Sequence, residues 1–196
     1  MKIIQSIIFC FLISGTIQAQ YLFKHTKNIE CTDIKNQART GTCWSFATAS
    51  FLESELMRQG HTDLNLSEMF VVRNIYKNKA HNYVLRQGKA NFSQGSLSHD
   101  LIAAVKRHGI VPDQVYSGLK QGEKAHDHNE MEAGLKGFLD GILQSKRLSK
   151  KWPLAFNGIL DAYLGKVPTE FMYMGESHTP ESFAAFLNIE PDNYIS

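Results

Sequence analysis

Asn36-Gln37-Ala38-Arg39-Thr40-Gly41-Thr42-Cys43-Trp44-Ser45-Phe46-Ala47 is the stretch that decides the fold of this chain. It begins as a tight polar turn and becomes helical at Cys43, because apolar residues recur on one face from there onward. The residues on that face are Trp44, Phe46, Ala47, Phe51, Leu52 and Leu56. Gly60 then ends the pattern. The sequence therefore predicts an amphipathic helix from Cys43 to about Met57, with a cysteine in its first turn.

This position gives the Cys43 thiol a chemical role. Unpaired backbone N–H groups and the positive end of the helix dipole favour thiolate, the nucleophilic form, in the first turn of a helix. Gln37 lies six positions ahead and carries a side-chain amide. Together with the backbone N–H of Cys43, that amide can donate to a developing oxyanion. We predict Cys43 as a nucleophile and Gln37 as an oxyanion-hole donor. The alternatives for Cys43 are a buried structural thiol or a disulfide with Cys31.

The segment resembles the signature around the nucleophile of papain-like cysteine peptidases, Cys-Gly-Ser/Ala-Cys-Trp/Tyr. Thr40 stands where that signature has its first cysteine, so the disulfide usual in the family is absent. Leu66-Ser67-Glu68 is similar to a helix start of the family, and Gly95 resembles the glycine that pairs with the substrate backbone. The resemblance implies an α+β papain-like fold and a peptide-hydrolysing enzyme without a metal or cofactor. It assigns catalytic roles to Cys43 and Gln37, and substrate binding to Gly95.

Two later segments resemble one particular group within the papain-like peptidases. Tyr163-Leu164-Gly165-Lys166-Val167-Pro168 and Thr179-Pro180-Glu181-Ser182-Phe183 are similar to the insertion of bleomycin hydrolases and related bacterial aminopeptidases. This implies that residues 20–196 form the mainly helical N-terminal lobe, with a helical insertion over 117–196, and that the β-rich second lobe is absent. It also implies aminopeptidase action, since in that group the C-terminal tail fills part of the cleft and selects free amino ends. Homo-oligomers are a further family expectation.

A histidine and an orienting asparagine are also needed. His178 follows Cys43 by 135 positions, within the spacing of papain-type chains. It stands just before the helix start Thr179-Pro180, and we interpret it as a surface residue that flanks the helix. The catalytic histidine and asparagine are therefore expected beyond Ser196, and this segment alone is expected to be inactive. We interpret His126-Asp127-His128 as solvated rather than as a metal site.

Residues 1–19 have the pattern of a signal peptide. Lys2 precedes an apolar run from Ile3 to Ile13, and the small residue Ala19 ends the segment. The protein is then secreted or periplasmic, with no membrane anchor after cleavage. The formal net charge of +2 falls by one when Lys2 leaves with the signal, and such a balance implies no nucleic acid partner. Peptide substrates as partners are what the family resemblance implies. Cys31 and Cys43 remain after cleavage, which excludes a disulfide-rich scaffold. We expect Cys31 to be a small buried apolar residue.

The rest of the chain predicts further helices and one strand. The expected elements are a helix capped by Ser67 and reaching Leu85, a helix capped by Ser96 or Ser98 and stopped by Gly109, helices over 130–146 and about 153–164, a strand over 170–174, and a helix from Thr179-Pro180 to about Asn188. Residues 117–129 are expected to form a surface loop. Two other functions fit the same pattern: a non-catalytic secreted binding domain derived from a peptidase lobe, and an acyl-transfer amidase that uses the same thiolate.

Overall fold

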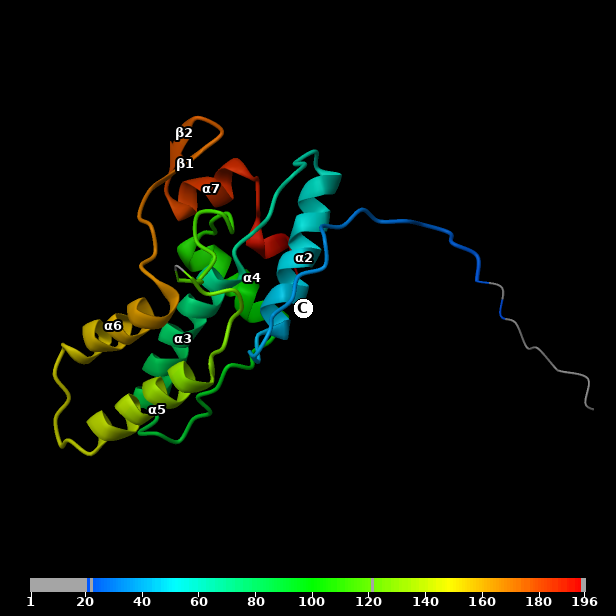
Figure 1. Cartoon of the computed structure of the whole chain (residues 1–196). Helices are drawn as coiled ribbons and strands as arrows, with labels where there is room; N and C mark the ends of the chain where they lie inside the picture. The colour runs from blue at the N-terminus through cyan, green and yellow to red at the C-terminus, as the bar shows by residue number, and fades with distance from the viewer. Residues whose placement is uncertain (1–20, 22, 121, 195–196) are drawn as a thin grey trace, which may run out of the picture.

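The computed structural model describes residues 21, 23–120 and 122–194, which form helices and one small hairpin (Figure 1). In chain order the elements are α2 (Cys43–Arg58), α3 (Glu68–Leu85), α4 (Ser98–His108), α5 (Asn129–Leu143), α6 (Trp152–Leu164), β1 (Phe171–Tyr173), β2 (Glu176–His178), α7 (Pro180–Phe186) and the 3-10 turn η1 (Pro191–Asn193). The mostly helical α+β fold predicted from the sequence is confirmed. The predicted signal peptide, 1–19, lies outside the described residues.

Helix α3 is the centre of the molecule. It contacts α2 and α4, and it also contacts α5 and α6, which pack against each other (Figure 1). Most of the largest fully buried side chains come from these helices, among them Leu52, Leu56, Met69, Leu101, Leu135, Phe156 and Leu160. Because the apolar faces of all five helices converge, the helices predicted as an insertion share one core with the helix that begins at Cys43.

Two helix starts follow the capping rules. The hydroxyl of Ser67 accepts a hydrogen bond from Phe70 N at 3.0 Å and caps α3. Thr179 caps α7, whose first residue is Pro180, and its hydroxyl accepts from Ser182 N at 3.2 Å. The serine cap expected for α4 is wrong, because Leu97 occupies that position and the Asp100 carboxylate accepts from its N–H at 3.4 Å instead.

Helix α7 docks on the end of α4 through a close backbone contact. Ile110 N donates to Pro180 O at 3.1 Å. Gly109 ends α4 with φ of 67°, and a Cβ there would lie 2.1 Å from the same carbonyl oxygen. Only glycine suits both the conformation and the space. The stop predicted at Gly109 therefore also fixes where α7 sits.

The strand expected over 170–174 is part of a hairpin that the sequence analysis missed. Strands β1 and β2 are antiparallel, with Phe171 opposite His178. The surface interpretation of His178 is wrong, because its side chain packs against the rings of Phe171, Phe183 and Phe186 and only 7% of the residue is exposed. The hairpin carries His178 inward, toward α7.

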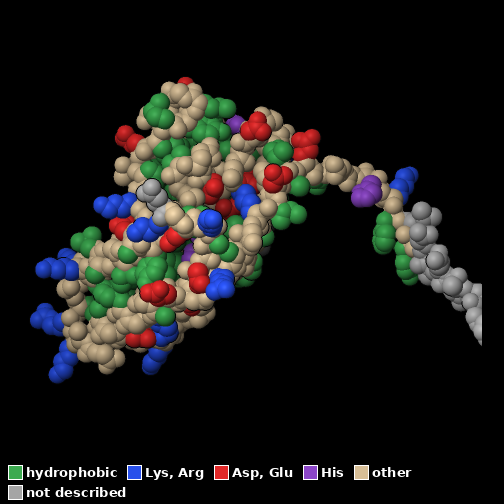
Figure 2. Space-filling model, viewed as in Figure 1, with side chains coloured by type: hydrophobic (Ala, Val, Ile, Leu, Met, Phe, Trp, Pro, Cys, Tyr) green, Lys and Arg blue, Asp and Glu red, His purple; other side chains and the backbone are tan. Residues whose placement is uncertain are grey.

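Residues 23–31 are exposed, and this N-terminal segment extends away from the helices (Figure 1). Cys31 is therefore exposed, and the expectation that it is buried is wrong. One residue later the chain is bonded to α2, because the Thr32 hydroxyl donates to Glu53 at 2.6 Å. On the face shown in Figure 2, basic and acidic side chains are interspersed over the helices. Within the described ranges, no helix combines the length and hydropathy that a membrane span requires.

Candidate active site

Cys43 is the first residue of α2, and its thiol is free and exposed. The preceding residue, Thr42, does not cap the helix, because its hydroxyl pairs with that of Thr40 at 2.5 Å. The backbone N–H groups of the first turn therefore remain close to the thiol without a side-chain acceptor from Thr42. Since Cys31 is also a free thiol, neither alternative predicted for Cys43 describes this arrangement. The nucleophilic role itself remains a prediction.

Gln37 is fixed within the loop of residues 36–42 that leads to Cys43, which we call the nucleophile loop. Its side-chain Nε2 donates to Thr40 O at 2.7 Å, and the Thr40 hydroxyl donates back to Gln37 O at 2.9 Å. Between them Ala38 adopts φ of 54°, and its N–H donates to the Asn36 side chain at 2.8 Å. A carboxamide has two N–H donors, so one donor of Gln37 holds the loop and the second is left for another acceptor.

A second segment braces this loop from outside. Arg39 N donates to His126 O at 3.0 Å, and His128 N donates to Arg39 O at 3.2 Å. The Arg39 and Asp127 side chains form an ion pair at 3.7 Å, which contributes little because both are exposed. The two backbone bonds therefore hold residues 126–128 against the nucleophile loop.

His128 is buried by this pairing, so the prediction that the His-Asp-His segment is solvated is wrong for it. Only 2% of His128 is exposed, and its ring packs near that of Tyr76. Burial lowers the pKa of His128 to about 4, so the imidazole is neutral at physiological pH. Among the residues that the structure describes, no three histidine, cysteine or acidic side chains are arranged to bind a metal.

Gln94 brings Gly95 to the nucleophile loop. Gly41 N donates to the Gln94 side chain at 2.7 Å, and Trp44 Nε1 donates to Gln94 O at 3.0 Å. The amide nitrogen of the Gln94 side chain donates to Glu132 at 2.6 Å, which ties the same residue to α5. Sequence analysis missed Gln94, whose only signal was its place beside Gly95. The structure thus joins the three predicted residues Gln37, Cys43 and Gly95 through one bonded loop system.

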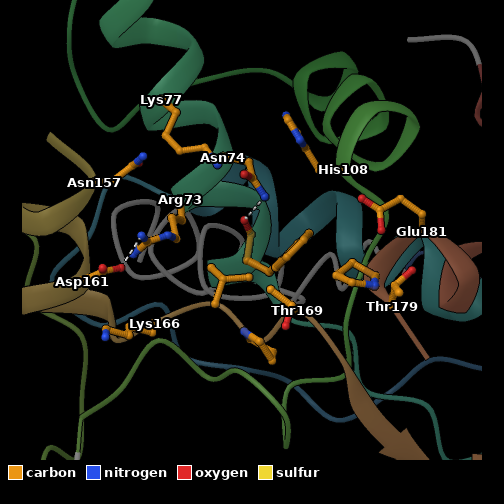
Figure 3. Close-up of a pocket in the computed structure, with 14 residues that line it drawn as sticks. Arg73, Asn74, Lys77, His108, Asn157, Asp161, Lys166, Thr169, Thr179 and Glu181 are labelled. Carbon is orange, nitrogen blue, oxygen red and sulfur yellow. Dashed lines mark hydrogen bonds and ion pairs between the residues drawn. The ribbon is translucent and has the colours of Figure 1, made fainter. Parts of the chain in front are cut away.

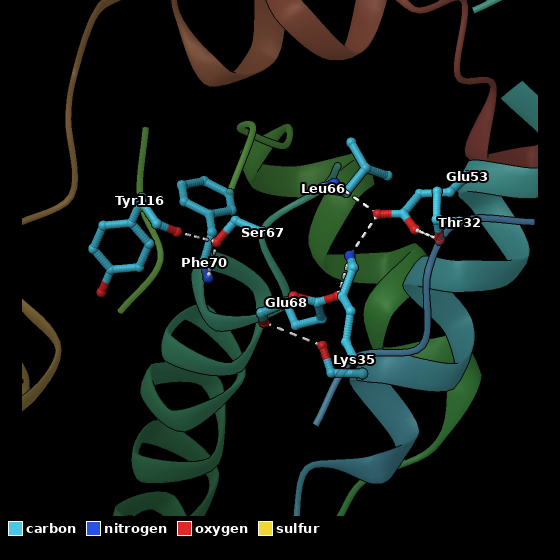
Figure 4. Close-up of polar contacts among 9 residues, drawn as sticks. Thr32, Lys35, Glu53, Leu66, Ser67, Glu68, Phe70 and Tyr116 are labelled. Carbon is cyan, nitrogen blue, oxygen red and sulfur yellow. Dashed lines mark hydrogen bonds and ion pairs between the residues drawn. The ribbon is translucent and has the colours of Figure 1, made fainter. Parts of the chain in front are cut away.

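A buried ionic group anchors the chain just before Gln37 (Figure 4). Lys35 Nζ lies 2.8 Å from Glu53 and 2.7 Å from Glu68. Glu53 is completely buried, and it also accepts from Leu66 N at 2.7 Å. Burial acts to lower the pKa of Lys35, but its hydrogen bonds to the two carboxylates outweigh burial and raise it. Lys35 therefore stays charged and ties the approach to Gln37 to both α2 and α3.

Most hollows of the surface lie away from Cys43, Gln37 and Gly95. One of about 550 Å³ lies between α3, α6 and α7 and contains Lys77 and the pair Arg73–Asp161, whose side chains are 2.5 Å apart (Figure 3). Cys43, Gln37 and Gly95 do not line it. A smaller hollow of about 260 Å³ is lined by Phe46 and Ala47, one turn after Cys43. Cys43 lines neither hollow, and its thiol is exposed on the surface outside both.

The sequence model of the papain family of cysteine proteases matches residues 20–150, which include the whole nucleophile loop and Gly95. The chain belongs to this papain family. The resemblance seen in the residues around Cys43 is thereby confirmed at the level of the family. No curated protein sequence matches the chain at a significant level.

Among solved structures, this papain-family chain is similar to PepW from Lactobacillus rhamnosis. The two superimpose with a TM-score of 0.63 at 19% identity, over 86% of this chain and 47% of PepW. At that identity the likeness shows the fold alone. The chain spans about half the length of PepW.

Proposed function

We propose that this chain is the nucleophile-bearing lobe of an exported cysteine peptidase, with Cys43 as the nucleophile. The observation that carries the proposal is a free, exposed thiol at the first residue of α2, within the segment that matches the papain family. A structural cysteine is usually buried and inert, whereas an exposed thiol at a helix N-terminus is placed to react.

The proposed reaction has two steps. The Cys43 thiolate attacks the carbonyl carbon of a peptide bond, and the resulting oxyanion accepts hydrogen bonds from Cys43 N–H and Gln37 Nε2. When the C–N bond breaks, the amine leaves with a proton from a histidine and a thioester remains. Water then hydrolyses the thioester, giving a carboxylic acid and the thiol. We place that histidine and its asparagine beyond Ser196, in a second lobe.

Aminopeptidase action is the finer part of the proposal. It is supported by the resemblance of residues 163–168 and 179–183 to the insertion of bleomycin hydrolases. Export is supported by the signal-like residues 1–19. Homo-oligomers in the complete protein belong to the same proposal.

The test compares Cys43→Ser with Cys31→Ser in the complete protein. Both residues are free, exposed thiols, so the second variant is a matched control for thiol loss. We expect Cys43→Ser to lower kcat/KM on peptide arylamides by roughly 10³-fold or more, and Cys31→Ser to leave it within about twofold. Mass spectrometry after brief iodoacetamide treatment should find the label at Cys43 before Cys31.

Retained turnover in Cys43→Ser would remove the nucleophile assignment. An intact wild-type protein without turnover would instead support the non-catalytic binding domain. Cleavage of free-amino but not N-blocked peptides would favour the aminopeptidase over an acyl-transfer amidase.

A further inference from the structure

A cation without a counter-ion lines the hollow between α3, α6 and α7. Lys77 reaches this hollow from α3 (Figure 3). Among residues 21, 23–120 and 122–194, no carboxylate lies within ion-pair distance of its ammonium group. Burial lowers the pKa of Lys77, and the charge of Arg73 one turn earlier lowers it further. A half-buried charge is unfavourable unless an anion compensates it, so the hollow is suited to an anionic ligand.

One acidic side chain of the hollow is already engaged by another cation. Arg73 is almost completely buried, with 5% of the residue exposed, and its Nη2 lies 2.5 Å from Asp161 Oδ1. Its Nη1 donates to Gly165 O at 3.0 Å, which fixes the guanidinium in place. Asp161 therefore balances Arg73 and does not neutralise Lys77.

Two buried polar atoms of the same hollow have no hydrogen-bond partner within the described part of the chain. They are Nε2 of His108, at the end of α4, and Oδ1 of Asn157, on α6 (Figure 3). Buried polar atoms are nearly always paired, so both indicate a group that binds there. Burial lowers the pKa of His108, and its ring is therefore neutral at physiological pH. A neutral imidazole with its proton on Nε2 donates to a carboxylate, and an amide oxygen accepts from an N–H.

The rest of the lining favours a monoanion with an apolar body. Lys166 adds a third cation, and Glu181 is the only carboxylate besides Asp161 among the described residues of the lining. Three cations against two carboxylates leave one positive charge, which one carboxylate balances, whereas a phosphate group carries more than one negative charge at pH 7. The apolar walls are Phe70, Val167, Pro168 and Pro180. The volume of about 550 Å³ suits a small organic molecule.

We propose that this hollow binds an acylated apolar amino acid, the chemistry found at the carboxyl end of a short peptide. Its carboxylate lies at Lys77 and His108, its N–H donates to Asn157 Oδ1, and its side chain contacts the apolar walls. Such a molecule has the single negative charge, the donor and the apolar body that the lining requires. The site goes beyond the proposed function and does not depend on Cys43, which does not line the hollow.

The experiment titrates the complete protein with N-acetyl-leucine and follows binding by calorimetry. We expect a Kd of about 1 mM or lower. N-acetyl-leucinamide keeps the apolar body and the N–H donor but lacks the carboxylate, so it should bind at least about tenfold more weakly. Inorganic phosphate, which lacks the apolar body, should also bind at least about tenfold more weakly.

Variants of α3 place the binding in the hollow. Lys77→Met should raise the Kd for N-acetyl-leucine at least about tenfold, and Lys77→Arg should keep it within about threefold because the charge remains. Lys79→Met is the matched control. Lys79 lies on the same helix and burial likewise lowers its pKa, but its Nζ donates to Ser93 O at 2.9 Å and it does not line the hollow. This variant should bind N-acetyl-leucine as the wild type does.

A stability measurement separates a ligand site from a structural lysine. Without ligand, Lys77→Met should unfold at no lower urea concentration than the wild type, because the ammonium group has no ion pair to lose. Unfolding at a clearly lower urea concentration would give Lys77 a structural role and count against the site.

Three binding results would overturn the proposal. The first is a folded wild-type protein that does not bind N-acetyl-leucine, as expected if an acidic side chain from another part of the complete protein fills the hollow. The second is an unchanged Kd in Lys77→Met. The third is equal or tighter binding of the amide or of phosphate, which would exclude recognition of an organic carboxylate.

Discussion

Gln37 is the residue whose contacts best define a single catalytic step. Its carboxamide is held by Thr40 O, which leaves one N–H for an oxyanion. We expect Gln37→Ala in the complete protein to lower kcat by about 10² to 10³, with a smaller effect on KM, because the oxyanion forms only as the reaction proceeds. Steady-state kinetics on a peptide arylamide measure both constants.

Two variants control this measurement. Gln37→Glu keeps the size of the side chain but removes its N–H donors, so it should lose activity as Gln37→Ala does. Gln59→Ala, at the opposite end of α2, should retain wild-type kcat. A kcat within twofold of wild type in Gln37→Ala would remove this side chain from the mechanism.

At the residue scale, the sequence could predict only what is local. The place of Cys43 follows from a helix start and its neighbours, and the structure has it exposed there. Gln94 was missed because its partners are distant, for example the 53 positions between Gly41 and Gln94. His178 was misplaced for the same reason, since its burial depends on rings from β1 and α7. No local pattern encodes such contacts.

At the scale of elements, the ionic group of Lys35, Glu53 and Glu68 joins the chain before Gln37 to α2 and α3. Removing one partner of a buried ion pair leaves an uncompensated charge. We expect Lys35→Met to lower the free energy of unfolding by about 3 kcal/mol, because Glu53 is completely buried. Urea unfolding followed by circular dichroism measures the change.

A second substitution separates charge from packing. Lys35→Met combined with Glu53→Gln should recover part of the lost stability, since the buried charge at residue 53 is then removed as well. Lys136→Met is the comparison, because its ion pair with Asp140 is exposed, and it should change stability by less than about 1 kcal/mol. Equal effects of Lys35→Met and Lys136→Met would show that burial of the first group does not matter.

Helices were predicted closely and the hairpin was not. Caps and stops such as Ser67, Gly109 and Thr179-Pro180 act within one turn, so the sequence displays them directly. The turn between β1 and β2 uses Met174 and Gly175 with φ of 50° and 87°. Asn-Gly or Asp-Gly is the usual signal for two positive φ values, and a methionine at the first position conceals it.

At the scale of the whole molecule, one core unites all the long helices, and the nucleophile loop is pinned to it from three directions. Residues 126–128 hold Arg39, Gln94 holds Gly41, and Lys35 fixes the approach to Gln37. The disulfide usual in the family is absent, since Thr40 replaces its cysteine. Hydrogen bonds and one ionic group therefore hold the loop without a covalent link.

His128 links this global packing to pH. The pKa of about 4 in the folded protein lies below the ordinary 6.5, because burial disfavours the imidazolium. Between these values the unfolded chain binds a proton at residue 128 that the folded chain does not bind. Stability therefore rises with pH through this window and is fully present above it. The shift corresponds to about 3 kcal/mol between pH 7 and pH 4.

We expect His128→Asn to reduce the loss of unfolding free energy between pH 7 and pH 4.5 by about 2 kcal/mol, because asparagine does not titrate. Urea unfolding at the two pH values measures this loss. The comparison is between the pH dependences and not between the absolute stabilities, because His128 holds the N-cap position before α5 and asparagine caps helices well there.

His25→Asn, at an exposed histidine, should leave the pH dependence unchanged. The neighbouring His126 also has a lowered pKa from burial, so the variant should retain part of the dependence. An unaltered pH dependence in His128→Asn would mean that the folded protein accommodates the charged ring, and that residues 126–128 are not held against the core as the loop requires.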